Sequence, residues 1–205
     1  MKRQQDAALS TYRQNRDDLI NFYKSLGQLS KKKIPKKLKE EDEGKEIDSA
    51  EMLLNQGIGQ FSKTSLGLSP TDLDVSVGRL AIAMFLIERV KKIREFAHKN
   101  DNLSFFSLYV SLRNQVSSTL VEQYYSKTPD QVINDYLDAE PLLCACSDLC
   151  GLAVPPLGEI VTEYKKVLAE RLLEAGKQPA APEGRGKAAP APEKRKTKKA
   201  RKKTK

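Results

Sequence analysis

Apolar residues recur every three or four positions over most of the first 176 residues, the spacing of one face of an α-helix. The first stripe predicts a helix over residues 4–26, with Gly27 placed to end it. Charged residues lie off this stripe, as expected for a helix with one buried face. The apolar positions of the stripe are Leu9, Tyr12, Leu19, Ile20, Tyr23 and Leu26.

Capping signals divide the rest of this region into further helices. Ser69 followed by Pro70 is a strong start, because serine accepts a free backbone N–H and proline suits the first helical position. Residues 80–87 carry no polar side chain, which predicts a central helix that is covered on every side. The patterns together predict helices over residues 49–56, 70–99, 102–126, 129–138, 141–150 and 157–175.

A charged segment separates the first two predicted helices. Within residues 31–48, six lysines at positions 31–39 are followed directly by four acidic residues at positions 40–43, and Pro35 and Gly44 argue against a continuous helix. The segment is therefore predicted to be a linker within the helical domain, ending at an N-cap on Asp48. Two interpretations remain open: a solvated loop, or a second basic contact with nucleic acid. The basic residues concerned are Lys31, Lys32, Lys33, Lys36, Lys37 and Lys39.

These elements predict an all-α fold, a bundle of five to seven helices over residues 1–176. No stretch alternates like a strand, and no Asn-Gly or Asp-Gly hairpin turn occurs. Trp is absent and aromatic residues are few, so Leu, Ile, Val and Ala must supply most of the core. The longest apolar run has eight residues, far fewer than the roughly 18 needed to span a membrane, so we expect an intracellular protein without a membrane partner.

Charge divides the chain into a nearly neutral body and a cationic tail. Residues 177–205 hold twelve Lys or Arg and two acidic residues, a local charge of +10. The whole chain carries +9, so residues 1–176 sum to about −1. This division indicates an anionic partner for the tail, for which nucleic acid is the first candidate.

The tail has two parts of different composition. Its first part is rich in Ala, Pro and Gly, lacks large apolar groups and is predicted to be a disordered spacer. The last thirteen residues contain more lysine than arginine and no aromatic residue, which favours phosphate contacts over base recognition. The predicted nucleic-acid-binding residues are Lys194, Arg195, Lys196, Lys198, Lys199, Arg201, Lys202, Lys203 and Lys205. The same residues also match a nuclear-import signal, and tethering to another anionic surface is a third interpretation.

No residue pattern predicts a catalytic, cofactor-binding or metal-binding site. His98 is the only histidine and lies near the predicted end of its helix, where its charge would suit the helix dipole. Cys144, Cys146 and Cys150 lack zinc-knuckle spacing, so buried thiols are the preferred interpretation over a metal site. The glycines at 57 and 59 lack the spacing of a phosphate-binding loop.

Two functional hypotheses from different classes follow. The first is a non-enzymatic helical protein that binds RNA or DNA through its tail, in a nucleocapsid, chromatin or ribonucleoprotein assembly. The second is a helical adaptor in a protein complex, whose tail is a nuclear-localisation or tethering signal. Both expect contacts of the helices with a protein partner or a second copy. In a eukaryotic cell both place the chain in the nucleus or nucleolus. The sequence does not distinguish RNA from DNA.

Overall fold

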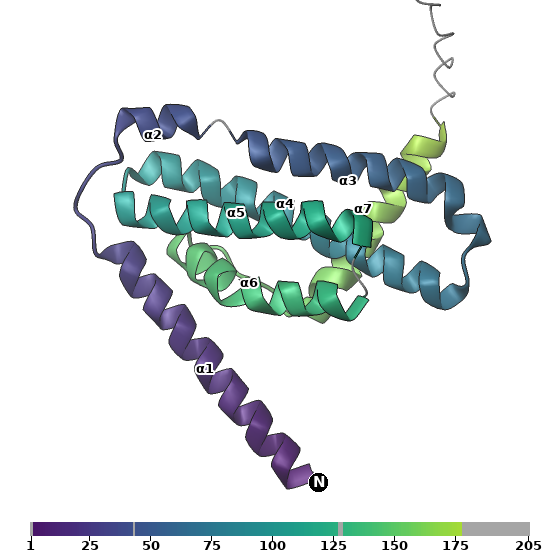
Figure 1. Cartoon of the computed structure of the whole chain (residues 1–205), viewed down its shortest axis with the longest axis horizontal. Coiled ribbons are helices and arrows are strands. Elements are labelled where there is room, and N and C mark those ends of the chain that lie inside the picture. The colour runs from purple at the N-terminus through teal and green to yellow at the C-terminus, as the bar shows by residue number, and fades with distance from the viewer. Residues whose placement is uncertain (1, 43, 127–128, 178–205) are drawn as a thin grey trace, which may run out of the picture.

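The computed structural model describes residues 2–42, 44–126 and 129–177, and this part of the chain is all-α, as predicted (Figure 1). The helices pack side by side into a bundle, with the first helix angled away from it. In chain order the elements are α1 (Lys2–Gln28), α2 (Lys36–Glu41), α3 (Lys45–Thr64), the 3₁₀ helix η1 (Ser65–Gly67), α4 (Pro70–Asn100), α5 (Leu103–Ser126), α6 (Pro129–Leu149) and α7 (Leu157–Lys177).

Helix α4 lies at the centre of the bundle and packs against α3, α5, α6 and α7. Its residues 81–87 are all buried, which confirms the prediction of a helix covered on every side. Ser69 caps it as predicted, since the Ser69 Oγ accepts the Asp72 N–H at 3.2 Å. A continuous apolar surface on one helix thus organises the core, because each neighbour can bury its own apolar face against it.

Helix α3 is longer than the predicted helix over residues 49–56. It begins at Lys45 rather than after an Asp48 cap, and it continues through both glycines at 57 and 59 to Thr64. Ile47, Leu54 and Ile58 are buried along this length against the core. Their burial outweighs the cost of glycine in a helix, about 1 kcal/mol each, so tertiary packing overrides local propensity here.

Residues 129–149 form one helix, α6, where the sequence predicts two. Pro141 lies inside it, and the predicted break before this residue is wrong. A proline within a helix removes one hydrogen bond and costs about 3 kcal/mol. Tyr136 and Leu143, on either side of Pro141, are both buried. Burial on both sides offsets the cost, because a break would remove one of these side chains from the core.

Helix α1 packs on α6 and α5 through its C-terminal half only. Gly27 lies one residue before the helix end, and a Cβ at this position would come within 2.6 Å of the Leu149 Cδ1. Glycine therefore lets α1 approach α6 closely here. Towards the N-terminus α1 projects away from the bundle, and residues 9–15 are all exposed (Figure 1).

Candidate nucleic-acid interface

The lysine-rich residues 31–39, here called the basic segment, are anchored to the bundle at two points. Ile34 is buried in the main hydrophobic core. The Lys32 carbonyl oxygen accepts the backbone N–H of Leu103, the first residue of α5, at 3.1 Å. These anchors leave the side chains of Lys31, Lys32 and Lys33 exposed. The segment thus presents a row of ammonium groups from a backbone that is held in place.

The three remaining lysines of the basic segment belong to α2 and differ in environment. Lys36 and Lys37 form ion pairs one helical turn along, with Glu40 at 3.5 Å and Glu41 at 3.6 Å. Both pairs are largely exposed, and such pairs contribute little, so these ammonium groups stay accessible to an anion.

Lys39 points towards the end of α4 instead. Its Nζ lies 2.6 Å from the Asp101 carboxylate and donates to the His98 carbonyl oxygen at 3.1 Å. This lysine therefore holds α2 against α4 rather than facing a partner. Five of the six predicted lysines of the patch are exposed, and the sixth has a structural contact.

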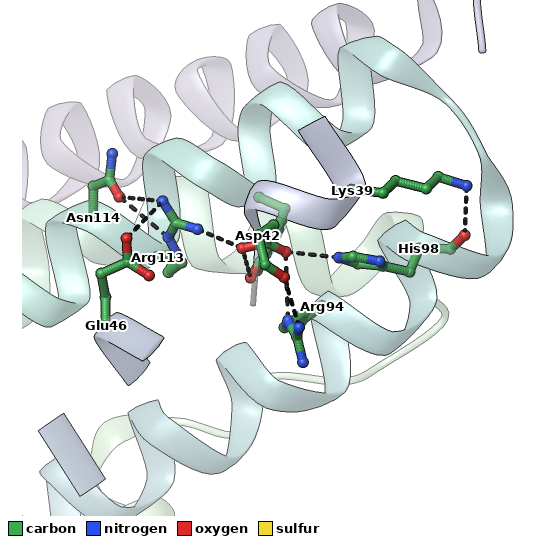
Figure 2. A network of polar contacts seen from close by, with 8 residues as sticks. Lys39, Asp42, Glu46, Arg94, His98, Arg113 and Asn114 are labelled. Carbon is green, nitrogen blue, oxygen red and sulfur yellow. Dashed lines mark hydrogen bonds and ion pairs between the residues drawn. The ribbon is translucent and has the colours of Figure 1, made fainter. Parts of the chain in front are cut away.

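A buried carboxylate fixes the junction between α2 and α3 (Figure 2). Asp42 pairs with Arg113 of α5 through one carboxylate oxygen, and Tyr109 of α5 donates to the same oxygen at 3.2 Å. The other oxygen accepts from His98 Nε2 at 2.6 Å and faces the Arg94 Nε at 3.4 Å, both of α4. We call these five residues the Asp42 cluster. It connects the segment that follows the lysines to two central helices.

Backbone and second-layer contacts complete the Asp42 cluster. Arg94 also donates to the Asp42 carbonyl oxygen at 2.7 Å. The Arg113 guanidinium donates to the Asn114 side chain at 3.0 and 3.2 Å and lies 3.6 Å from Glu46. Every buried donor that points at Asp42 therefore has an acceptor, which is the condition for a stable buried ion pair.

The charge of Asp42 is favoured by its partners. Burial alone raises the pKa of a carboxyl group, but the hydrogen bond from His98 and the charges of Arg113 and Arg94 outweigh it and lower the pKa of Asp42 below its ordinary value. The pKa of Tyr109 is raised, by burial and then by the Asp42 charge, so its hydroxyl remains a donor. The cluster is thus an ionised carboxylate surrounded by donors.

Gly44 completes the junction with a left-handed backbone, φ +73°. A Cβ at this position would lie 3.1 Å from the Arg94 Cζ. We expect Gly44→Ala to lower the free energy of unfolding by about 1–2 kcal/mol, because alanine is strained in this conformation. Gly59→Ala is the control, since Gly59 is helical with open space around it and should be neutral or stabilising. Urea unfolding midpoints test the pair, and equal effects would contradict this account of the junction.

The predicted linker is therefore not a solvated loop throughout. It contains α2, and Ile34 and Asp42 are buried. Sequence patterns did not single out Asp42, which lies in a run of acidic residues. One signal was present: Arg113 falls within an apolar stripe of the predicted helix over residues 102–126. A charge in such a stripe needs a buried partner of opposite sign.

His98 lies in the last turn of α4, as predicted, but its main contact is Asp42. Cys144 and Cys146 are buried thiols as predicted, whereas Cys150 is half-buried. Burial raises the pKa of Cys144 to about 11 and that of Cys150 to about 12. At neutral pH these thiols are protonated and poor nucleophiles.

The residues predicted to bind nucleic acid in the tail lie outside the described part of the chain: Lys194, Arg195, Lys196, Lys198, Lys199, Arg201, Lys202, Lys203 and Lys205. The end of α7, from which the tail begins, does lie in the described part of the chain. In Figure 1 the end of α7 lies at the opposite end of the bundle from α2. The basic segment and the start of the tail therefore lie at opposite ends of the bundle.

No family model, characterised protein or solved structure matches this chain. Among the described residues, no helix is both long and apolar enough to cross a membrane. In the same residues no group of three or more His, Cys, Asp or Glu side chains is placed to hold a metal ion. The function has to be inferred from the exposed charge and from the contacts that position it.

Proposed function

We propose that this chain is a non-enzymatic nucleic-acid-binding protein that contacts phosphates through two cationic regions. One is the lysine-rich end of the tail, residues 194–205, and the other is the basic segment. The observation that carries the proposal is the exposure of Lys31, Lys32 and Lys33 on a backbone anchored by Ile34 and by the Leu103 N–H. Exposed ammonium groups on an anchored backbone can neutralise phosphates with little further loss of backbone entropy.

The two cationic regions can act on one nucleic acid. Residues 178–193 are rich in Ala and Pro, and sixteen residues at ~3.1 Å each reach about 50 Å when extended. Binding by one region would raise the effective concentration of the other, so the two together bind more tightly than either alone.

The residue types favour binding that does not depend on base sequence. Lysine outnumbers arginine in both regions, and lysine acts as a point charge rather than as a bidentate reader of bases. Neither region contains an aromatic side chain on which a base could stack. The expected contact is with phosphate in RNA or DNA, in a ribonucleoprotein, chromatin or nucleocapsid assembly.

Removing residues 194–205 should weaken binding to a random RNA or DNA duplex by roughly a hundredfold or more at low salt, because most phosphate contacts are lost. In the intact chain log affinity should fall with log salt with a slope of roughly −5 if five or six phosphates are contacted. Fluorescence anisotropy over a salt series measures both quantities. Unchanged affinity after the deletion would overturn the proposal.

The contribution of the basic segment is tested separately. The triple variant Lys31→Gln, Lys32→Gln and Lys33→Gln should make the salt slope shallower by about one unit for each lysine that contacts a phosphate. Lys63→Gln near the end of α3 is the control, since this exposed lysine lies outside both regions. A triple variant with an unaltered slope would restrict the interface to the tail.

A second candidate function is supported by a different observation. In the first half of α1, the apolar side chains of Leu9 and Tyr12 are exposed by 49% and 45%, as expected for an adaptor with a protein partner. In this alternative the tail is a nuclear-localisation or tethering signal. Deleting residues 194–205 should then move a fluorescently labelled chain out of the nucleus of a eukaryotic cell while binding of RNA and DNA stays unchanged.

A further inference from the structure

The exposed apolar side chains of α1 form a stripe along the helix, here called the α1 stripe. Leu9, Tyr12, Leu19 and Phe22 are exposed by 49%, 45%, 44% and 55%. Tyr12 and Leu19 are seven residues apart and lie on one face, with Leu9 and Phe22 flanking it. We propose that the α1 stripe pairs antiparallel with the α1 stripe of a second copy of this chain. This interface goes beyond the proposed nucleic-acid binding and does not depend on it.

The spacing of the α1 stripe is symmetric about its centre. Leu9 and Phe22 are equally far from the point between residues 15 and 16, and so are Tyr12 and Leu19. A two-fold axis at that point therefore brings Tyr12 level with Leu19 of the other copy, and Leu9 level with Phe22. An isologous dimer requires such a self-complementary patch, whereas an interface with a different protein does not.

The exposed area is sufficient for a dimer. From their exposed fractions, the four side chains offer roughly 400 Å² per protomer, given ~150–250 Å² for a whole aromatic side chain. Two copies together reach about 800 Å², and the flanking residues of two paired helices bring the total above the ~1,000 Å² of a specific interface.

Charge at the two-fold axis does not oppose the pairing. Arg16 lies beside the axis and would meet its own copy there. Its guanidinium is already paired with Glu140 of α6 in the same chain, at 2.9 and 3.2 Å, which also raises the pKa of Arg16. In the antiparallel arrangement the two bundles lie at opposite ends of the helix pair, because each bundle contacts only the C-terminal half of its own α1.

Light scattering after size exclusion tests the proposal on the intact chain, treated with nuclease and run in high salt so that nucleic acid cannot bridge two copies. We expect twice the monomer mass for the parent chain and the monomer mass for Tyr12→Glu and Leu9→Glu. Ser10→Glu is the control, since Ser10 is exposed on the face of α1 opposite Tyr12 and Leu19, and it should stay dimeric. A monomeric parent chain at high micromolar concentration would overturn the proposal.

Crosslinking tests the register. Asn15→Cys places an exposed thiol next to the two-fold axis and should give a disulfide-linked dimer under mild oxidation, whereas the parent chain should not crosslink. A dimer that survives Tyr12→Glu, or that fails to crosslink through Asn15→Cys, would overturn this pairing. If Tyr12→Glu is monomeric but still binds a short RNA, dimerisation and nucleic-acid binding are separate properties. A negative result for one of these proposals then does not contradict the other. Circular dichroism of each variant verifies that the bundle is folded.

Discussion

Asp42→Ala is expected to lower the free energy of unfolding by about 3–5 kcal/mol, because it leaves the buried Arg113 guanidinium without its main counter-charge. Arg113 is itself buried, and its guanidinium would face the core without its main acceptor. His98 and Arg94 would lose the second carboxylate oxygen, and Tyr109 would lose the acceptor of its hydroxyl. The loss would also release the junction of α2 and α3 that follows the basic segment.

Urea unfolding followed by circular dichroism measures this loss. Asp101→Ala is the matched control, since it also removes a carboxylate paired with a cation, Lys39, but in a pair whose side chains are 28% and 32% exposed. Its effect should be smaller, because water and salt still reach and screen a pair that is only half-buried. Adding Arg113→Met to Asp42→Ala should recover part of the lost stability, since the unpaired buried charge is then gone. A loss for Asp42→Ala no larger than that for Asp101→Ala would contradict the cluster as described.

The Asp42 cluster also predicts the direction in which the free energy of unfolding changes at acidic pH. The folded-state pKa of Asp42 lies below its unfolded value of 3.8, so the folded state favours the ionised form. Its contribution is therefore fully present above pH ~4 and is lost as the pH falls through the folded-state pKa. Asp42→Asn cannot titrate at this position. The difference in stability between the parent chain and Asp42→Asn should shrink on acidification below pH ~4, and a constant difference would be contrary to this account.

Phe85→Ala should be comparably severe, about 3–5 kcal/mol, because it opens a cavity at the centre of the bundle. The Phe85 ring is buried in the middle of α4 and meets the Tyr164 ring of α7 edge to face, with centroids 5.6 Å apart. The Arg89 guanidinium lies 5.2 Å from the same ring. Truncation removes these contacts, and close-packed neighbours can collapse only in part.

Leu66→Ala is the control for the core substitution. Leu66 is 97% exposed in η1, so its truncation should change the unfolding midpoint very little. Denaturant titrations of both variants compare the two sites. A lower midpoint denaturant concentration, with an unchanged dependence of the unfolding free energy on denaturant, would show that stability and not compactness has changed. Equal effects at Phe85 and Leu66 would mean that α4 is not the centre of the core.

The long helices could be predicted from local pattern because their signals are local. Ser69 and Pro70 mark the start of α4, and the run at residues 80–87 marks its buried middle. The predicted helix boundaries were wrong where local helix propensity and tertiary packing favour different structures. The glycines within α3 and Pro141 within α6 weaken a helix locally, yet the burial of neighbouring side chains in the same helix maintains it. A pattern read along the chain contains no measure of that burial.

The candidate interface was predicted only in part, for a similar reason. Clustering of charge is visible in a sequence, so the lysines of the basic segment could be identified from local composition. Which of them face solvent could not be predicted in this way, since Lys39 turns inward only because Asp101 and the end of α4 lie beside it. Asp42 resembles its acidic neighbours in every local respect. It differs only in meeting Arg94, His98, Tyr109 and Arg113, which are more than 50 positions away.

Local and compositional signals were enough to predict the all-α class, the central place of α4, and the division into a nearly neutral body and a cationic tail. Helical periodicity, capping and net charge are properties of neighbouring residues or of a sum over them. Three features follow only from the packing of distant elements: Asp42 is buried among cations, Lys31 to Lys33 are exposed on an anchored backbone, and the α1 stripe is about half exposed. Each of these depends on which distant side chains share a volume, because burial and ion pairing are set by proximity in space and not along the chain.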